Sequence, residues 1–163
     1  MAPNNTEKKY IAQRTTQNIS DALREIGELS SIFYLYYYFN KKGWSVYKNY
    51  DEKGYDILLF NKKTGKKIKI EIKTRQKLIG SLSNKNKNKN VHFTLTEVEK
   101  NAADYLIGLW YEYNMFFITP TSELKKMKSR NKKTYKLIVS MNEKNKLNSI
   151  GNRYLNNWKC INV

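Results

Sequence analysis

Cysteine and histidine are almost absent from this sequence, and their scarcity excludes two kinds of structural site. Its 163 residues include one cysteine, Cys160, and one histidine, His92. A single cysteine excludes an internal disulfide and is typical of a reducing compartment. A zinc site built from Cys and His ligands is excluded as well, because it would need several such residues. We expect a structural role for His92.

Long hydrophobic runs are also missing. The longest apolar run, residues 32–39, is too short to span a membrane. The first ten residues, MAPNNTEKKY, lack the apolar segment of a signal peptide. We therefore expect a soluble, intracellular protein with no membrane partner, in the cytoplasm or nucleoid, or in the nucleus or a viral factory if the source is eukaryotic or viral.

Neither an internal repeat nor a linker divides the chain. At 163 residues it is long enough to bury one core, which predicts a single domain. Its first part, residues 1–15, is polar and is expected to be flexible. We place the domain at residues 16–163, with a core motif over about residues 16–119 and a basic C-terminal extension over residues 120–163.

Acidic residues are scarce relative to basic ones. The sequence has 31 Lys and Arg against 14 Asp and Glu, which gives a formal net charge of +17 and a pI near 9.8. A charge of this sign and size favours a polyanionic partner, since each neutralised phosphate releases counterions and adds affinity. We expect nucleic acid to be the partner, and we expect no small-molecule substrate.

The segment from Gly54 to Thr74 reads as a β-hairpin. Two runs rich in aliphatic residues, Ile57–Phe60 and Ile68–Ile72, flank a polar turn at residues 61–66 that contains a glycine. Side chains alternate between the two faces of a strand, so each run has an aliphatic face and a charged face. We expect the aliphatic face to pack into the core.

The register of this hairpin sets two carboxylates side by side. If the loop is symmetric, Phe60 stands opposite Lys67, and the same register sets Asp56 opposite Glu71, with Lys73 one step further on. Like charges directly opposite on a sheet destabilise it, and a divalent cation is the simplest compensation. Carboxylate oxygens suit Mg²⁺ or Mn²⁺. The alternative interpretation is a hairpin whose outer face is merely charged.

An acidic residue at the start of one strand, followed by Glu-x-Lys in the next, resembles the PD-(D/E)xK nuclease superfamily, which has the restriction-endonuclease-like fold. The matching residues are Asp56 and Glu71-Ile72-Lys73, and Tyr55 stands where the family motif has its proline. The order of expected elements, helix, three strands, helix and strand, is similar to the family's αβββαβ core. The resemblance implies an α/β fold with a mixed central sheet flanked by helices. It leaves the subfamily open.

Apolar residues at helical spacing predict a helix from Thr16 to Lys42, ended by Gly43. They form one line along the helix: Ile19, Ala22 and Leu23, Ile26, Leu29, Phe33, Tyr36 and Tyr37. Glu28 begins a second line that continues through Ile32, Leu35 and Phe39, where an unpaired carboxylate would be costly. The family carries a glutamate near the metal on its first helix. The resemblance therefore implies this role for Glu28, with Glu25 as a competitor.

The remaining elements follow from local patterns. We expect strands at residues 44–47, 105–111, 115–119 and 135–140, a helical turn at residues 122–124, and a closing helix at residues 150–158 with Tyr154, Leu155 and Trp158 facing inward. A capping box formed by Thr94 and Glu97 predicts a short helix to about Ala103.

Two lysine-rich segments are candidates for contacting a phosphate backbone. The first, residues 75–90, ends in NKNKNKN and is expected to be a mobile loop, with Lys85, Lys87 and Lys89 as its candidate residues. The second, residues 125–136, contains the candidates Lys125, Lys126, Lys128 and Arg130. A solvated surface without function is the alternative for each segment.

The resemblance implies hydrolysis of DNA phosphodiester bonds with Mg²⁺ as cofactor and Mn²⁺ able to substitute. Asp56 and Glu71 would be the principal metal ligands, joined by the backbone carbonyl of Ile72, and Glu28 would bind a second metal or a metal-bound water. Lys73 would contact the scissile phosphate and position or help to deprotonate the water. Two copies of one site cut two strands, so a homodimer is expected.

Three functions remain open from the sequence. A site-specific endonuclease of restriction or homing type is favoured by the strand that ends at Pro120 and by the tail around Arg153 and Trp158. A structure-specific Holliday-junction resolvase is the alternative, since the chain is small and highly charged. A basic protein that binds nucleic acid without cutting it is the second alternative.

Overall fold

The computed structural model describes residues 16–76, 89–129 and 132–162, with the backbone alone at residues 128 and 129. The expected flexible segment at residues 1–15 and most of the predicted loop at residues 75–90 lie outside these ranges. Among the described residues, no helix is both long enough and apolar enough to cross a membrane.

The chain forms three α-helices and eight strands within the described ranges, joined by short 3₁₀ turns. In chain order these are α1 (Gln17–Phe39), β1 (Trp44–Lys48), β2 (Ile57–Asn61), β3 (Lys67–Arg75), β4 (Lys89–Thr96), α2 (Glu97–Ala102), β5 (Tyr105–Trp110), β6 (Met115–Pro120), β7 (Lys125–Ser129), β8 (Lys132–Met141) and α3 (Ser149–Tyr154). The 3₁₀ turns are Asn40–Lys42, Tyr111–Tyr113, Thr121–Glu123 and Trp158–Cys160.

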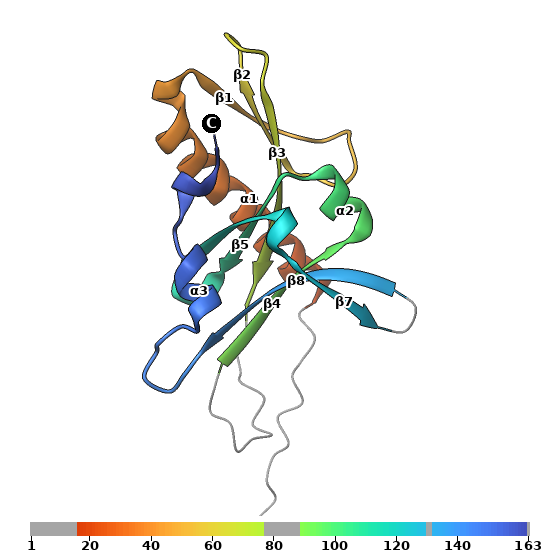
Figure 1. The fold of residues 1–163 in the computed structure, drawn as a ribbon, viewed down its shortest axis with the longest axis vertical. Coiled ribbons are helices and arrows are strands. Elements are labelled where there is room, and N and C mark those ends of the chain that lie inside the picture. The colour runs from red at the N-terminus through yellow and green to blue at the C-terminus, as the bar shows by residue number, and fades with distance from the viewer. Residues whose placement is uncertain (1–15, 77–88, 130–131, 163) are drawn as a thin grey trace, which may run out of the picture.

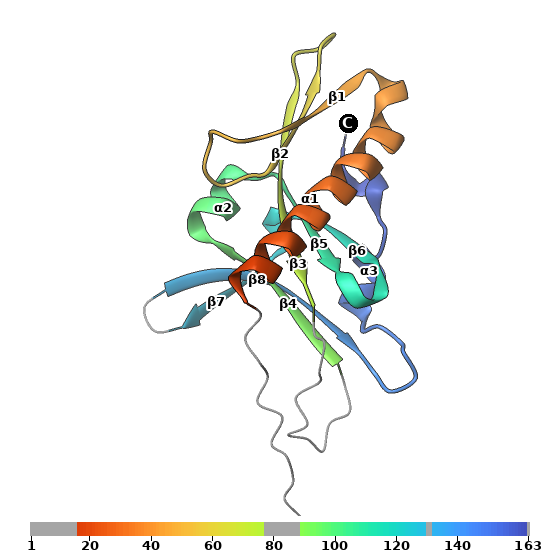
Figure 2. The ribbon, with the colours of Figure 1, turned by 180° about the vertical axis from the view of Figure 1, so that it is seen from behind.

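Two sheets and a long helix stack as layers. The main sheet has the strand order β1-β2-β3-β5-β6, in which β3 and β5 are parallel and the other neighbours antiparallel. Helix α1 crosses one face of this sheet (Figure 2), and the smaller sheet β4-β8-β7 lies on the opposite face (Figure 1). The predicted α/β class with a mixed central sheet flanked by helices is confirmed.

Strand β5 supplies apolar side chains to both faces of the main sheet, as expected for a strand buried on each side. Ile107 and Leu109 belong to the core under α1, whereas Leu106 and Trp110 belong to the core shared with the small sheet. At Gly108, between them, an added Cβ would lie 2.7 Å from the ring of Phe93. The glycine therefore lets the two sheets approach closely.

The hairpin forms in the predicted register. Phe60 pairs with Lys67 and Ile57 with Ile70, so the pairing runs on to set Asp56 beside Glu71. The side chain of Asn61 closes the turn, because its Oδ1 accepts hydrogen bonds from the backbone amides of Lys63 and Thr64. The aliphatic face is buried, as expected from the alternation.

The prediction that Thr94 caps the second helix is wrong. Thr94 lies within strand β4, and the capping box is formed by Thr96 and Glu99, two residues later. The segment around Thr94 forms a strand and not a helix because Phe93 and Leu95 are fully buried between the sheets, which keeps it extended. Lys89 and Asn90, expected to lie in a mobile loop, are the first residues of β4.

Helix α1 forms as predicted and ends in a 3₁₀ turn at Gly43, whose φ of 80° suits a glycine. It is the second line, Glu28 to Phe39, that faces the sheet. Of the first line only Leu23 is buried, and most of the others are exposed. Sequence periodicity alone could not choose between two apolar lines on one helix.

The C-terminal part differs in detail from expectation. The basic run at residues 125–136 forms most of the hairpin β7–β8, and the predicted strand at residues 135–140 is the end of β8. The predicted closing helix stops at Tyr154 because Asn156 adopts a φ of 48°, although Tyr154 and Trp158 are buried as expected. A 3₁₀ turn, Thr121–Glu123, stands close to the helical turn expected at residues 122–124.

Candidate active site

A cleft opens where strand β3 extends beyond the end of β2. Pairing between the two strands ends at Ile57 and Ile70, and β3 continues to Arg75. The cleft has a volume of ≈ 660 Å³ and is lined by the first half of α1, residues 49–56, the end of β3 and Glu99 of α2. It therefore collects side chains from segments that are distant in the sequence.

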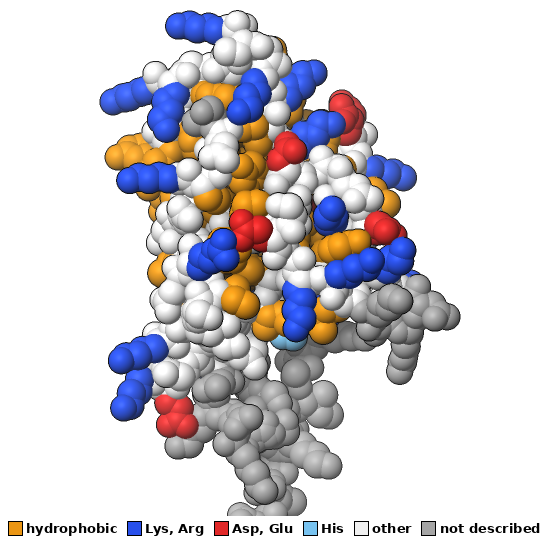
Figure 3. Space-filling view, viewed as in Figure 1, with side chains coloured by type: hydrophobic (Ala, Val, Ile, Leu, Met, Phe, Trp, Pro, Cys, Tyr) orange, Lys and Arg blue, Asp and Glu red, His pale blue; other side chains and the backbone are white. Residues whose placement is uncertain are grey.

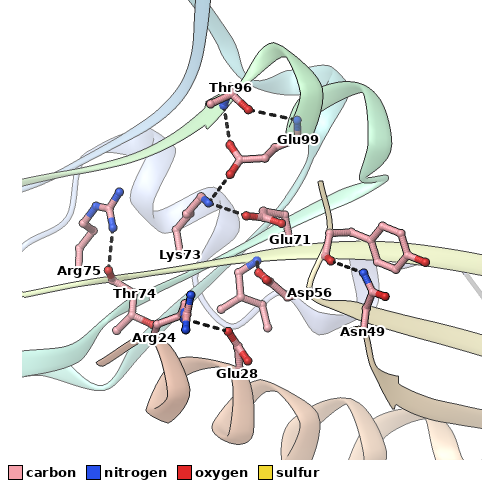
Figure 4. Close-up of polar contacts among 12 residues, drawn as sticks. Arg24, Glu28, Asn49, Asp56, Glu71, Lys73, Thr74, Arg75, Thr96 and Glu99 are labelled. Carbon is pink, nitrogen blue, oxygen red and sulfur yellow. Dashed lines mark hydrogen bonds and ion pairs between the residues drawn. The ribbon is translucent and has the colours of Figure 1, made fainter. Parts of the chain in front are cut away.

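Asp56 and Glu71 lie together at the wall of this cleft (Figure 4). The backbone amide of Ile72 donates a 2.7 Å hydrogen bond to Oδ2 of Asp56, which fixes that carboxyl beside β3. The side chain of Glu71 projects from the preceding residue of the strand and is 5 % exposed. The structure thus brings together the two carboxyls that the hairpin register predicted.

Both carboxyl groups have raised pKa values. Burial is the largest cause of the raised pKa of Asp56, and the charge of Glu28 adds to it. Burial likewise raises the pKa of Glu71 to about 8, and the charge of Asp56 is the next contribution. Two buried acids with raised pKa values are typical of a site that accepts a cation or a proton.

Lys73 lies between two carboxylates. Its Nζ is 2.5 Å from Oε1 of Glu71 and 2.7 Å from Oε1 of Glu99, and both carboxylates contact it in Figure 4. Burial lowers the pKa of Lys73, but the charges and hydrogen bonds of Glu71 and Glu99 outweigh it, so the net pKa is raised. The side chain is therefore held as an ammonium ion.

Sequence reasoning missed Glu99. This residue completes the capping box of α2, since its Oε2 accepts a 2.6 Å hydrogen bond from the amide of Thr96 while its other oxygen contacts Lys73. The sequence does contain the capping-box pattern Thr96-Glu97-Val98-Glu99. Residues 94–97 match the same Thr-x-x-Glu pattern two positions earlier. The choice between them depends on where β4 ends.

Glu28 comes from α1 and is 6 % exposed, whereas its competitor Glu25 is exposed on the helix surface. Its carboxylate pairs with Nζ of Lys48 at 2.9 Å and with Nε of Arg24 at 3.7 Å. Asp56 lies between Glu28 and Glu71 in Figure 4. Glu28 is thus close enough to influence Asp56 but is itself neutralised by cations.

The position of Glu28 depends on a close helix–strand contact. At Gly27 an added Cβ would lie 1.8 Å from Oγ1 of Thr74. Only glycine therefore lets α1 approach β3 so closely at this point. This close approach brings Glu28 near the acid pair.

The predicted phosphate-binding residues are only partly described. Lys85, Lys87 and Arg130 lie outside the described residues, and the side chain of Lys128 is not described. Lys89 donates a 2.6 Å hydrogen bond to the hydroxyl of Tyr113, at the start of β4. Lys125 and Lys126 are exposed on β7.

Other basic residues, which sequence reasoning did not single out, line the cleft itself. Arg24, Lys53 and Arg75 contribute to its wall beside Lys73. Arg75 is held by hydrogen bonds to the backbone carbonyls of Thr74 and His92. The lining of the cleft thus combines these basic side chains with several carboxylates.

The donor set suits a hard divalent cation. Among the described residues there is no group of three or more His, Cys, Asp or Glu side chains arranged to hold a metal ion. A protein nevertheless usually supplies only one or two carboxylate ligands to Mg²⁺, because the ion keeps several of its bound waters. A cation between Asp56 and Glu71 would also offset the charge of Asp56, which contributes to the raised pKa of Glu71.

Comparison with solved structures identifies the architecture. The bacterial homing endonuclease I-Ssp6803I matches with a TM-score of 0.55 over 91% of this chain and 92% of its own, at 16% sequence identity. The protein has the restriction-endonuclease-like fold. The fold that the Asp56 and Glu71-x-Lys73 resemblance implied is therefore confirmed.

Further matches accompany this fold. Hjc, a Holliday junction resolvase from Archaeoglobus fulgidus, matches with a TM-score of 0.47 at 17% identity, over 74% of this chain and 84% of its own. The family described as "Protein NO VEIN, C-terminal" matches residues 27–106, just under half of the chain, a segment that contains the acid pair and Lys73. A search of curated proteins found no match.

Proposed function

We propose that the protein is a Mg²⁺-dependent DNA endonuclease that hydrolyses phosphodiester bonds in the cleft at the end of β3. The observation that carries the proposal is the arrangement of Asp56, Glu71 and Lys73 on one wall of that cleft, in a restriction-endonuclease-like fold. Hydrolysis of a phosphodiester needs a nucleophilic water, neutralisation of phosphate charge and stabilisation of the leaving oxygen. The site offers a group for each requirement.

Asp56 and Glu71 would hold the divalent cation. When bound, the cation would polarise the phosphate and lower the pKa of a bound water. Asp56 is kept in position by the amide of Ile72, so it needs no rearrangement to act as a ligand. Glu71 must lose its proton before it can bind the cation, so metal binding is coupled to proton release. Mn²⁺ prefers the same oxygen ligands and should substitute.

Lys73 acts as an ammonium ion in this proposal. Its raised pKa keeps the proton on the amine, so it donates hydrogen bonds and positive charge rather than accepting a proton. It can contact a phosphate oxygen and orient the attacking water. Glu99 holds it through a second hydrogen bond, beside the one to Glu71.

DNA would lie across the cleft and the hairpin β7–β8. Arg24, Lys53 and Arg75 line the cleft. The hairpin carries further lysines, among them Lys125, Lys126 and Lys133. The face shown in Figure 3 carries many basic side chains beside a few acidic ones. Together with the net charge of +17, this distribution supports a polyanionic substrate.

Within this activity we favour site-specific cleavage of homing or restriction type. The match to a homing endonuclease spans 91% of this chain, so it includes part of the chain beyond the αβββαβ core. A β-hairpin such as β7–β8 has the width to enter the major groove, where base edges can be read. Cleavage of both strands would use two copies of the chain.

The test is incubation of the protein with supercoiled plasmid and with a four-way junction, each with and without Mg²⁺. We expect Mg²⁺-dependent cutting of plasmid into discrete fragments. Resolved junction arms without plasmid cutting would replace the site-specific form by a resolvase. Retention of both nucleic acids without any cutting would overturn the endonuclease and leave a binding protein.

Matched variants connect the cutting to the site. Asp56→Asn keeps an acceptor for the amide of Ile72 but removes a charge, and should lower the rate by about a hundredfold or more, as expected when a metal ligand is lost. Glu97→Gln removes an exposed carboxylate two residues from Glu99 and should leave the rate unchanged. Equal rates for Asp56→Asn and wild type would contradict the assignment.

A further inference from the structure

The outward face of α1 is apolar, yet none of the described elements covers it (Figure 2). Large apolar side chains stand exposed along it at helical spacing: Ile19, Ile26, Leu29, Phe33, Tyr36 and Tyr37. We call this set the outer stripe. The opposite face is apolar as well, with Leu35 and Phe39 buried against the main sheet. A helix that is apolar on both faces is typical of one that is buried on both.

The outer stripe has the size of a protein interface. Phe33 is 65% exposed and Tyr37 is 69% exposed. With about 150–250 Å² for a whole aromatic side chain, the stripe presents on the order of 500–650 Å² of apolar surface. The largest apolar patch on a typical monomer is about 300–600 Å² and is often functional, so the stripe lies at the upper end of this range. A standard interface takes roughly 800 Å² from each partner, so the stripe and its rim would suffice for one.

The chemistry of the stripe argues against other occupants. It carries no lysine or arginine, so it does not suit a phosphate backbone. The sequence of residues 1–15 offers three large apolar residues, Met1, Tyr10 and Ile11, against six in the stripe. A second apolar helix face is the surface that matches it.

We propose that the outer stripe is the surface through which two copies of this chain pair, with their α1 helices antiparallel. A twofold interface needs a self-complementary patch, which a continuous apolar stripe provides. Asp21 and Glu25 outnumber Arg24 near the first end of α1, whereas Lys41 and Lys42 follow its last residue. An antiparallel pair sets the acidic end of one helix toward the basic end of the other and opposes the two helix dipoles.

The pairing holds whether or not the protein cuts DNA, so it can be tested without nucleic acid. Sedimentation velocity should show a dimer for wild type across the micromolar range. Phe33→Glu should weaken dimerisation by roughly thirtyfold or more, the usual effect of losing a central interface residue. Its circular dichroism and thermal midpoint, measured on the monomer, should match those of monomeric wild type, because Phe33 packs little within one copy.

Val98→Glu is the matched control. Val98 is 63% exposed, as Phe33 is, but it lies on α2 and away from the stripe. This variant should remain dimeric. Wild type that is monomeric at every concentration, or a Phe33→Glu variant that dimerises as wild type does, would overturn the proposal. Monomeric wild type that binds anionic lipid vesicles through Phe33 would also overturn it and assign the stripe to a membrane.

The antiparallel orientation of the two α1 helices can be tested separately, with substitutions that introduce no charge. Ser30 lies near the middle of the helix and Gln17 at its first residue. In an antiparallel pair, a short bis-maleimide should join two copies of Ser30→Cys but not two copies of Gln17→Cys. Wild type, which keeps Cys160, gives the background. Equal joining of both variants would indicate parallel helices and contradict the antiparallel arrangement.

Discussion

The ammonium of Lys73 lies 2.7 Å from a carboxylate oxygen of Glu99, which ties the end of β3 to the first turn of α2. The same carboxylate caps α2 through the amide of Thr96. Glu99 thus has two tasks, one in folding and one in holding the ammonium ion beside Glu71. A substitution that separates the two tasks shows whether the second one matters.

Glu99→Gln makes that separation. Glutamine can still cap the helix, so the thermal midpoint should change little. The charge that holds Lys73 is lost, and the cleavage rate should fall by about tenfold to a hundredfold with DNA affinity nearly unchanged. Single-turnover rates and binding curves measure the two quantities separately. A fall in stability without a fall in rate would reduce Glu99 to a helix cap.

The contact between Gly27 and Thr74 predicts a strict size limit. In Gly27→Ala the new Cβ would fall 1.8 Å from Oγ1 of Thr74, so α1 must shift. The free energy of unfolding should drop by about 1–3 kcal/mol, the usual cost of overpacking. Chemical denaturation measures it.

A second substitution tests the cause of that loss. In Gly27→Ala with Thr74→Ala, the clashing oxygen is gone and the nearest remaining neighbour stays beyond 3 Å. Much of the lost stability should return. If the double variant is no more stable than Gly27→Ala alone, the close approach is not the reason for the glycine.

The sequence was sufficient for the hairpin and its acid pair. Two aliphatic runs of period two predicted which face is buried, and a loop taken as symmetric predicted the register that places Asp56 beside Glu71. Strand β4 was missed for a physical reason. This strand is buried by its contacts within the second sheet, which are long-range. The local lysine-rich sequence could not predict them. The role of Glu99 was missed for the same reason, because helix α2 begins only where that strand ends.

The buried face of α1 was equally undetermined by local pattern. Two apolar lines run along the helix, and the sheet packs against the one that contains Glu28. The first line stays on the surface. A line that is apolar but exposed is visible only once the tertiary contacts are known, and it led to the proposed pairing of two copies.

The raised pKa of Glu71 predicts how stability depends on pH in the absence of divalent metal. Its folded pKa is about 8, against 4.5 for an ordinary glutamate. Between these values the folded state binds more protons than the unfolded state, so the free energy of unfolding falls as pH rises. Asp56 acts in the same direction. Glu99, with a lowered pKa, acts in the opposite direction and only in acid.

Glu71→Gln isolates this contribution. It should match wild type near pH 5 and exceed it near pH 8 by roughly 2–4 kcal/mol, given about 1.36 kcal/mol for each pKa unit. Denaturation at a series of pH values with chelator present measures the difference. Parallel pH profiles for the two proteins would show that Glu71 ionises normally in the fold.

The central claim is that Asp56 and Glu71 together hold a divalent cation, and calorimetric titration with Mn²⁺ at neutral pH tests it most directly. Asp56→Asn, Glu71→Gln and the exposed control Glu97→Gln complete the set. The account predicts Mn²⁺ binding to wild type and Glu97→Gln with release of protons, and a loss of affinity of about tenfold or more in each site variant. Equal Mn²⁺ affinity in all four proteins, or no binding by wild type, would contradict it.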